Sequence, residues 1–157
     1  MEVREHTISL LVNNKPDVLA RIAGIFSGRG YNIENISANV MMDPKVTKIT
    51  IVTTGNTATV TQIQKQLKKL VDVINVSIPG ESRYAQREMA LVKMNLHEDT
   101  MAEITKIVEG FTSGRVVTNA DYCIVEITGD KREIDLALTR LDAIGIDDVS
   151  RSGVVTL

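Results

Sequence analysis

The sequence predicts an α+β protein built from two tandem βαββαβ units, each an antiparallel sheet with two helices on one face. Apolar residues alternate where strands are expected and recur at helical spacing where helices are expected. This order of segments occurs twice along the 157 residues, separated by a short polar stretch. Hydrophobic residues make up 43% of the chain, enough for packed cores, and aromatic residues only 3%, so the cores are expected to be aliphatic.

The first unit begins with an apolar, β-branched segment typical of a strand. Pro16 is expected to open the first helix, because its fixed φ and missing N–H cost nothing there. An apolar stripe at helical spacing follows from Val18 to Phe26, and the glycines at 28 and 30 are expected to end the helix. The expected elements are a strand at 6–13, the helix opened by Pro16, a hairpin of strands 36–42 and 47–53, a helix across 60–71, and a strand at 72–78.

The second unit repeats this order in weaker form. We therefore divide the chain into a first unit at 1–79, a polar linker at 80–88 and a second unit at 89–157. The expected elements of the second unit are a strand at 89–96, a helix across 104–111, strands 115–118 and 122–128 joined by a turn at 119–121, a helix across 134–141, and a closing strand at 148–157.

Composition and charge exclude several classes of protein. The formal net charge is −2, whereas a nucleic-acid surface normally carries a clear basic excess. The single cysteine, Cys123, excludes an internal disulfide, and its apolar neighbours predict an inert buried thiol. No apolar segment approaches the roughly 20 residues that span a bilayer, and the first residues do not resemble a signal peptide. We expect no nucleic-acid or membrane partner and a cytoplasmic location.

The sequence predicts no catalytic or metal site. The only histidines, His6 and His97, fall at expected strand ends without neighbouring ligands. The acidic pair Glu98-Asp99 precedes a helix and complements its dipole. Gly28 and Gly30 follow a helix, whereas phosphate-binding glycines follow a strand and open a helix. A convergent set of titratable groups, which acid–base catalysis requires, is not recognisable.

One segment is typical of a binding site. Residues 13–17 join the first strand to the first helix, and the free N–H groups at a helix start attract a carboxylate or phosphate. Asn14 is then either part of a binding loop or only the cap of the helix. Asn32, after Gly30 and Tyr31, is either a second binding group or an ordinary turn asparagine.

These residues together form a family pattern. The run NNKPDVLARIAGIFSGRGYNIENI, residues 13–36, resembles the opening of an ACT domain, a ferredoxin-like module that binds amino acids. Further segments extend the resemblance in the order of one ACT-containing family: FSGRGYNIE at 26–34, KQLKKLVDVINV at 65–76, REMALVK at 87–93 and RSGVVTL at 151–157. Over essentially its whole length the chain resembles the small regulatory subunits of acetohydroxyacid synthase, also called acetolactate synthase.

The resemblance implies a non-catalytic subunit of branched-chain amino-acid (valine, leucine, isoleucine) biosynthesis. Residues 1–79 would be an ACT domain that dimerises, and 89–157 a second ferredoxin-like domain. The chain would bind no cofactor itself, activate a catalytic large subunit that carries thiamine diphosphate, FAD and Mg, and confer feedback inhibition by valine. The effector site would combine residues of two chains: from one chain Asn14 and the backbone of Lys15, Pro16, Asp17 and Val18, and from the other Asn32 and Ile33.

Asp17 departs from the family pattern, in which glycine usually occupies this position. The aspartate either only favours the first helical turn, or its charge repels the carboxylate of valine and weakens binding. Two other functions share features with this sequence. A stand-alone amino-acid sensor shares the loop, but it does not account for the family-like second half. A ferredoxin-like acylphosphatase needs a catalytic arginine and asparagine in the first unit, whereas Arg21 and Arg29 lie on or after the helix.

Overall fold

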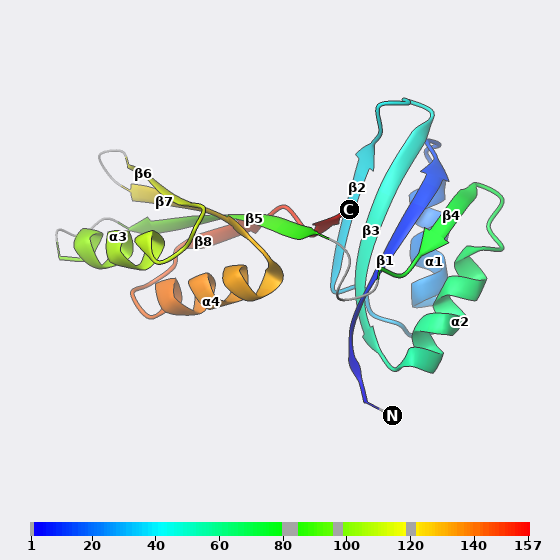
Figure 1. Cartoon of the computed structure of the whole chain (residues 1–157), viewed down its shortest axis with the longest axis horizontal. Coiled ribbons are helices and arrows are strands. Elements are labelled where there is room, and N and C mark those ends of the chain that lie inside the picture. The colour runs from blue at the N-terminus through cyan, green and yellow to red at the C-terminus, as the bar shows by residue number, and fades with distance from the viewer. Residues whose placement is uncertain (1, 80–84, 96–98, 119–121) are drawn as a thin grey trace. The chain divides into compact units, whose positions relative to one another are not determined.

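A computed structural model of the chain describes residues 2–79, 85–95, 99–118 and 122–157. The chain divides into two compact units (Figure 1). The N-terminal unit comprises Met1–Ala85 together with Thr156–Leu157, and the C-terminal unit comprises Gln86–Val155. Each unit is described below by itself. None of the helices in the described ranges is long and apolar enough to cross a membrane.

The N-terminal unit has the predicted βαββαβ order. Its four strands form one antiparallel sheet in the order β2-β3-β1-β4, and α1 and α2 lie together on one face of this sheet (Figure 1). The elements are β1 (Arg4–Asn13), α1 (Val18–Ser27), β2 (Asn35–Val40), β3 (Val46–Gly55), α2 (Thr57–Leu67) and β4 (Val73–Ser77).

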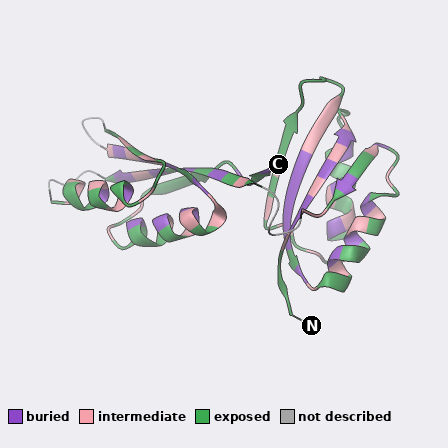
Figure 2. Cartoon of the chain, viewed as in Figure 1, coloured by how far each residue is buried: buried purple, intermediate pink, exposed green. Residues whose placement is uncertain are grey.

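The core of the N-terminal unit lies between the sheet and the helices. Ile8, Leu10 and Val12, alternate residues of β1, are buried against side chains such as Ile22 and Phe26 of α1. Figure 2 shows buried residues in both the strands and the helices of this unit. Full burial of such a side chain stabilises the fold by about 1.5–3 kcal/mol. The other face of the sheet carries a polar row, because the strand register aligns Ser37, Thr50, Ser9 and Ser77 across all four strands. The aliphatic core predicted from composition is confirmed.

The C-terminal unit repeats the architecture, and one extra short strand, β9, begins at its last residue, Val155. The sheet order is β6-β7-β5-β8, and β9 pairs with β5. Cys123 is buried in this core, and burial raises the pKa of its thiol. The elements are β5 (Gln86–Asn95), α3 (Met101–Glu109), β6 (Gly114–Thr118), β7 (Tyr122–Gly129), α4 (Lys131–Asp142), β8 (Asp148–Arg151) and β9 (Val155–Thr156).

Two predicted boundaries in this half of the chain are wrong. The linker was expected to extend to residue 88, but β5 begins at Gln86 because Glu88 is a buried strand residue paired with Arg151. The closing strand was expected to be continuous over 148–157, but Gly153, with a φ of 81°, interrupts it between β8 and β9. The rest of the predicted linker, 80–84, and the predicted turn at 119–121 lie outside the described residues.

Candidate functional site

The β1–α1 loop, defined here as residues 14–17, joins the middle of the sheet to the first helix. Pro16 does not open the helix as predicted. It lies in a turn, in which Val18 N–H donates to the Lys15 carbonyl at 3.4 Å, and α1 begins at Val18. The first bond of helical spacing runs from Arg21 N–H to the Asp17 carbonyl at 3.1 Å. The β1–α1 loop therefore ends in a turn, and the helix begins only after it, at Val18.

Asn14 is fixed by the β2–β3 hairpin and does not cap the helix. Its backbone N–H donates to the Lys45 carbonyl at 2.8 Å, and its side-chain Nδ2 donates to the Pro44 carbonyl at 2.9 Å. The interpretation of Asn14 as a simple helix cap is thus wrong. With Nδ2 engaged by Pro44, Oδ1 is the acceptor that this exposed side chain offers to a ligand.

The start of α1 leaves backbone donors beside Asn14. Among the described helices, α2 and α4 are capped by Asn56 and Asp130, whereas α1 and α3 have no side-chain cap. The first N–H groups of a helix have no intrahelical acceptor, and with the helix dipole they favour an anion. An uncapped start alone does not mark a site, as α3 shows. At α1 the uncapped start lies next to Asn14, which two hydrogen bonds hold in place.

Asp17 forms an ion pair along the first turn of α1. Its carboxylate pairs with the Arg21 guanidinium one turn along α1 at 2.6 Å, and both side chains are about half exposed. The positive charge of Arg21 offsets the negative charge that, in the second interpretation of Asp17, would repel a bound carboxylate. This geometry favours the interpretation that Asp17 serves the first helical turn.

Asn32 and Ile33 lie in the segment between α1 and β2. Asn32 Nδ2 donates to Glu34 at 2.8 Å, and the Asn32 carbonyl accepts from the Thr53 hydroxyl at 2.6 Å. Ile33 packs partly against the core. As in Asn14, engagement of the amide nitrogen leaves the side-chain Oδ1 of Asn32 as an acceptor.

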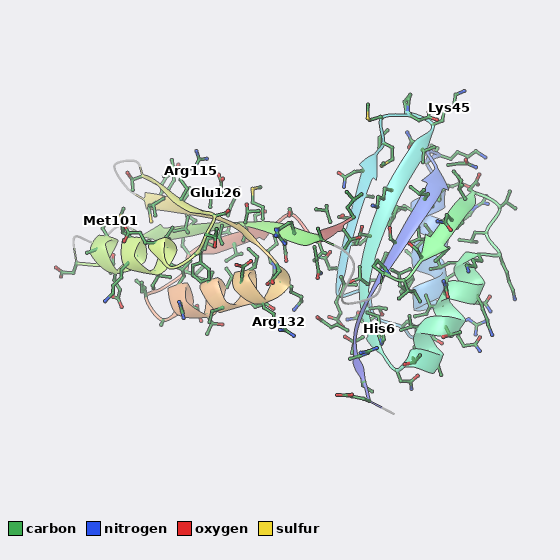
Figure 3. The ribbon with its side chains drawn as sticks, in the orientation of Figure 1. His6, Lys45, Met101, Arg115, Glu126 and Arg132 are labelled. Carbon is green, nitrogen blue, oxygen red and sulfur yellow. The ribbon has the colours of Figure 1, made fainter. Side chains whose placement is uncertain are left out.

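A single chain does not bring the two halves of the predicted site together. Asn32 contacts Thr53, which pairs with His6 near the start of β1, whereas Asn14 contacts Lys45 beyond the end of β1. Residues 6 and 13 of an extended strand are roughly 23 Å apart at about 3.3 Å per residue. Figure 3 shows His6 and Lys45 at opposite ends of the sheet. The two asparagines can meet only between two chains.

Two buried acids were missed by sequence reasoning. Asp72, between α2 and β4, accepts from Asn13 and Lys15 at the start of the β1–α1 loop. Glu88, with 1% of its side chain exposed, forms two hydrogen bonds with Arg151 at 2.6 and 2.8 Å. Asp72 gives a signal as an acid within an apolar run, whereas Glu88 falls at the end of the predicted polar linker. The partners of both acids are too distant in sequence to be identified from it.

Candidate metal ligands do not gather in the described part of the chain. No group of three or more His, Cys, Asp or Glu side chains within it is placed to hold a metal. His6 Nε2 contacts the Gly55 carbonyl at 3.1 Å. His97 and Glu98 lie outside the described residues.

Comparison with known proteins identifies both halves of the chain. Residues 8–75 match a family described as an AHAS small subunit-like ACT domain, and residues 87–157 match the small subunit of acetolactate synthase. A probable acetolactate synthase small subunit of Methanothermobacter thermautotrophicus is 39% identical over 98% of this chain and 92% of the relative. The acetolactate synthase small subunit of Mycobacterium bovis is 32% identical over 100% of this chain and 94% of the relative.

A solved structure supports the same assignment. The crystal structure of the acetolactate synthase small subunit from Thermotoga maritima superposes with a TM-score of 0.87 at 34% identity, covering 98% of this chain and 96% of that chain. The N-terminal unit, with its β1–α1 loop, is an ACT domain. The chain as a whole belongs to the acetolactate synthase small-subunit family.

Proposed function

We propose that this chain is a non-catalytic regulatory subunit that binds the catalytic subunit of acetolactate synthase, raises its activity and makes it sensitive to valine. Family membership over the whole chain supports the regulatory role. The observation that carries the effector site is Asn14, held by Pro44 and Lys45 beside the uncapped start of α1.

The chemistry of valine fits the groups at this site. Its carboxylate suits the N–H groups at the start of α1, where the helix dipole favours a negative charge. Its ammonium suits the Oδ1 acceptors of Asn14 and of Asn32 from a second copy. Its isopropyl group suits an apolar surface such as Ile33, which is half-buried in the single chain.

The second copy would pair through β2, an edge strand of the sheet. Ile36 and Val40 of this strand are 39% and 56% exposed, and an edge strand with exposed apolar side chains is a ready site for another strand. Antiparallel pairing of two β2 strands would place the Asn14 end of one chain beside the Asn32 end of the other. Both halves of the site would then be complete in a symmetric dimer.

Val40→Lys tests this dimer. A lysine in the apolar contact should raise the dimer dissociation constant more than tenfold, because its charge would be buried without a partner. Val117→Lys is the matched control, since Val117 is also an edge-strand valine and is 48% exposed. Sedimentation velocity of the full chain at tens of micromolar measures the effect. An unchanged dimer in Val40→Lys would exclude pairing through β2.

The regulatory role is tested by acetolactate formation. The chain alone should condense no pyruvate, and saturating addition should raise the rate of the catalytic subunit supplied with thiamine diphosphate, FAD and Mg, cofactors that we assign to that partner. Valine should lower the activated rate. An unchanged catalytic rate together with measurable valine binding would instead indicate a stand-alone amino-acid sensor.

A further inference from the structure

Asp72 binds both sequence neighbours of Asn14. The residue is only 6% exposed. Its Oδ1 atom accepts hydrogen bonds from Asn13 Nδ2 at 3.0 Å and from Lys15 Nζ at 2.7 Å. Its backbone carbonyl accepts a third from the Asn13 N–H at 2.8 Å. One residue from the α2–β4 loop thus fixes the chain on either side of Asn14.

The β2–β3 hairpin holds Asn14 itself. Two further hydrogen bonds, to the Pro44 and Lys45 carbonyls, fix its backbone and its side chain. The orientation of the Asn14 amide is therefore set by two anchors, the hairpin and Asp72, which come from distant parts of the sequence. A binding group held in this way loses little conformational freedom when a ligand arrives.

The charge of Asp72 also matters for an amino-acid ligand. The hydrogen bond from the Lys15 ammonium and then that from the Asn13 amide hold the pKa of Asp72 below its usual range. Burial opposes this effect, and the positive charges of Lys15 and Arg21 add to it. The carboxylate is therefore ionised at neutral pH and offsets the charge of Lys15. A lysine released from this pair would place a mobile positive charge near Asn14, where the ammonium of an amino acid is expected.

We propose that Asp72 is a positioning residue for the effector: through Asn13 and Lys15 it holds the β1–α1 loop in the conformation that presents Asn14 and the start of α1 to one ligand. The inference rests on the valine site proposed above. It adds to that site a residue that does not touch the ligand and that lies 57 residues beyond Lys15 in the sequence.

Asp72→Asn in the full chain is the test, since the shape of the side chain is kept and the charge is lost. Valine affinity measured by titration calorimetry should fall about tenfold, the effect of losing one preorganising contact. The backbone ¹H–¹⁵N resonances of Asn14, Lys15, Asp17 and Val18 should shift, whereas those of β5 in the C-terminal unit should not. Asp147→Asn, which breaks the 3.1 Å Lys93–Asp147 pair of the C-terminal unit, is the matched control and should change neither readout.

Lys15→Met removes the positive partner of the Lys15–Asp72 ion pair at an exposed position. This variant provides the test if Asp72→Asn does not fold. Its valine affinity should fall severalfold, with the same resonances shifted. Wild-type affinity in the folded variants would overturn the positioning role and leave the valine site standing. If the wild-type chain itself does not bind valine, the proposed effector is overturned, and the role of Asp72 is overturned with it.

Discussion

Replacing Arg151 with methionine is expected to destabilise the C-terminal unit by about 3 kcal/mol. The substitution would leave Glu88, whose side chain is 1% exposed, without the guanidinium that binds both of its oxygens. Removing one partner of a buried ion pair typically costs about 3–5 kcal/mol. We expect the lower end of this range, because Arg151 is itself one-third exposed. Arg151 also bonds Asp135 of α4 at 3.0 Å, so the substitution would release the helix from β8 as well.

Arg115→Met is the matched control in the same unit. Arg115 pairs with Glu126 at 2.8 Å, but these side chains are 67% and 34% exposed, and Figure 3 shows the pair on β6 and β7. An exposed ion pair contributes about 0–1 kcal/mol. Loss of stability in Arg115→Met equal to that in Arg151→Met would show that burial of Glu88 is not the cause.

Amide hydrogen exchange separates the two units within one chain. A loss of about 3 kcal/mol corresponds to roughly a hundredfold faster exchange of the most protected amides in β5 and β7. Exchange in β1 and β3 should stay unchanged and provides an internal reference. The double variant Glu88→Met/Arg151→Met should recover much of the stability, because an apolar pair can replace a buried ion pair at little cost. Equally faster amide exchange in both units would contradict the prediction that Arg151→Met destabilises only the C-terminal unit.

The architecture was predictable because it depends on local pattern. The alternation of Ile8, Leu10 and Val12 and the helical spacing from Val18 to Phe26 are visible within short windows, and each defines one buried face. The repeated order of these windows was enough to predict both βαββαβ units. The ACT-domain and small-subunit resemblance rested on longer runs of the same residues.

The details that were wrong depend on contacts between distant residues. Glu88 reads as part of a polar linker until Arg151, 63 residues further along, is placed beside it. Asn14 reads as a helix cap until the Pro44 carbonyl, 30 residues away, is found to engage its side chain. The two halves of the predicted effector site were both located by resemblance, but only the strand register shows that one chain holds them at opposite ends of its sheet.

Asn14→Ala is expected to weaken valine binding roughly tenfold to a hundredfold. A hydrogen bond to a charged ligand group typically contributes about 1.5–3 kcal/mol, and alanine removes the Oδ1 acceptor proposed for the valine ammonium. It also removes the bond to Pro44 that fixes the loop. Asn75→Ala, at an exposed asparagine of β4, is the control and should bind as the wild type does. Titration calorimetry of valine into the full chain measures all three proteins.

Asp17→Gly completes the same series and tests the one departure from the family. A carboxylate a few ångströms from that of valine would cost on the order of 1–4 kcal/mol if it had no partner, and the glycine variant would then bind about fivefold to several hundredfold more tightly. In this structure the Asp17 carboxylate lies 2.6 Å from the Arg21 guanidinium, which cancels most of that repulsion. We therefore expect Asp17→Gly to tighten valine binding by less than about threefold. A tenfold gain in valine affinity in Asp17→Gly would show that Arg21 does not offset the charge of Asp17. Wild-type affinity in Asn14→Ala would remove the β1–α1 loop from the effector site.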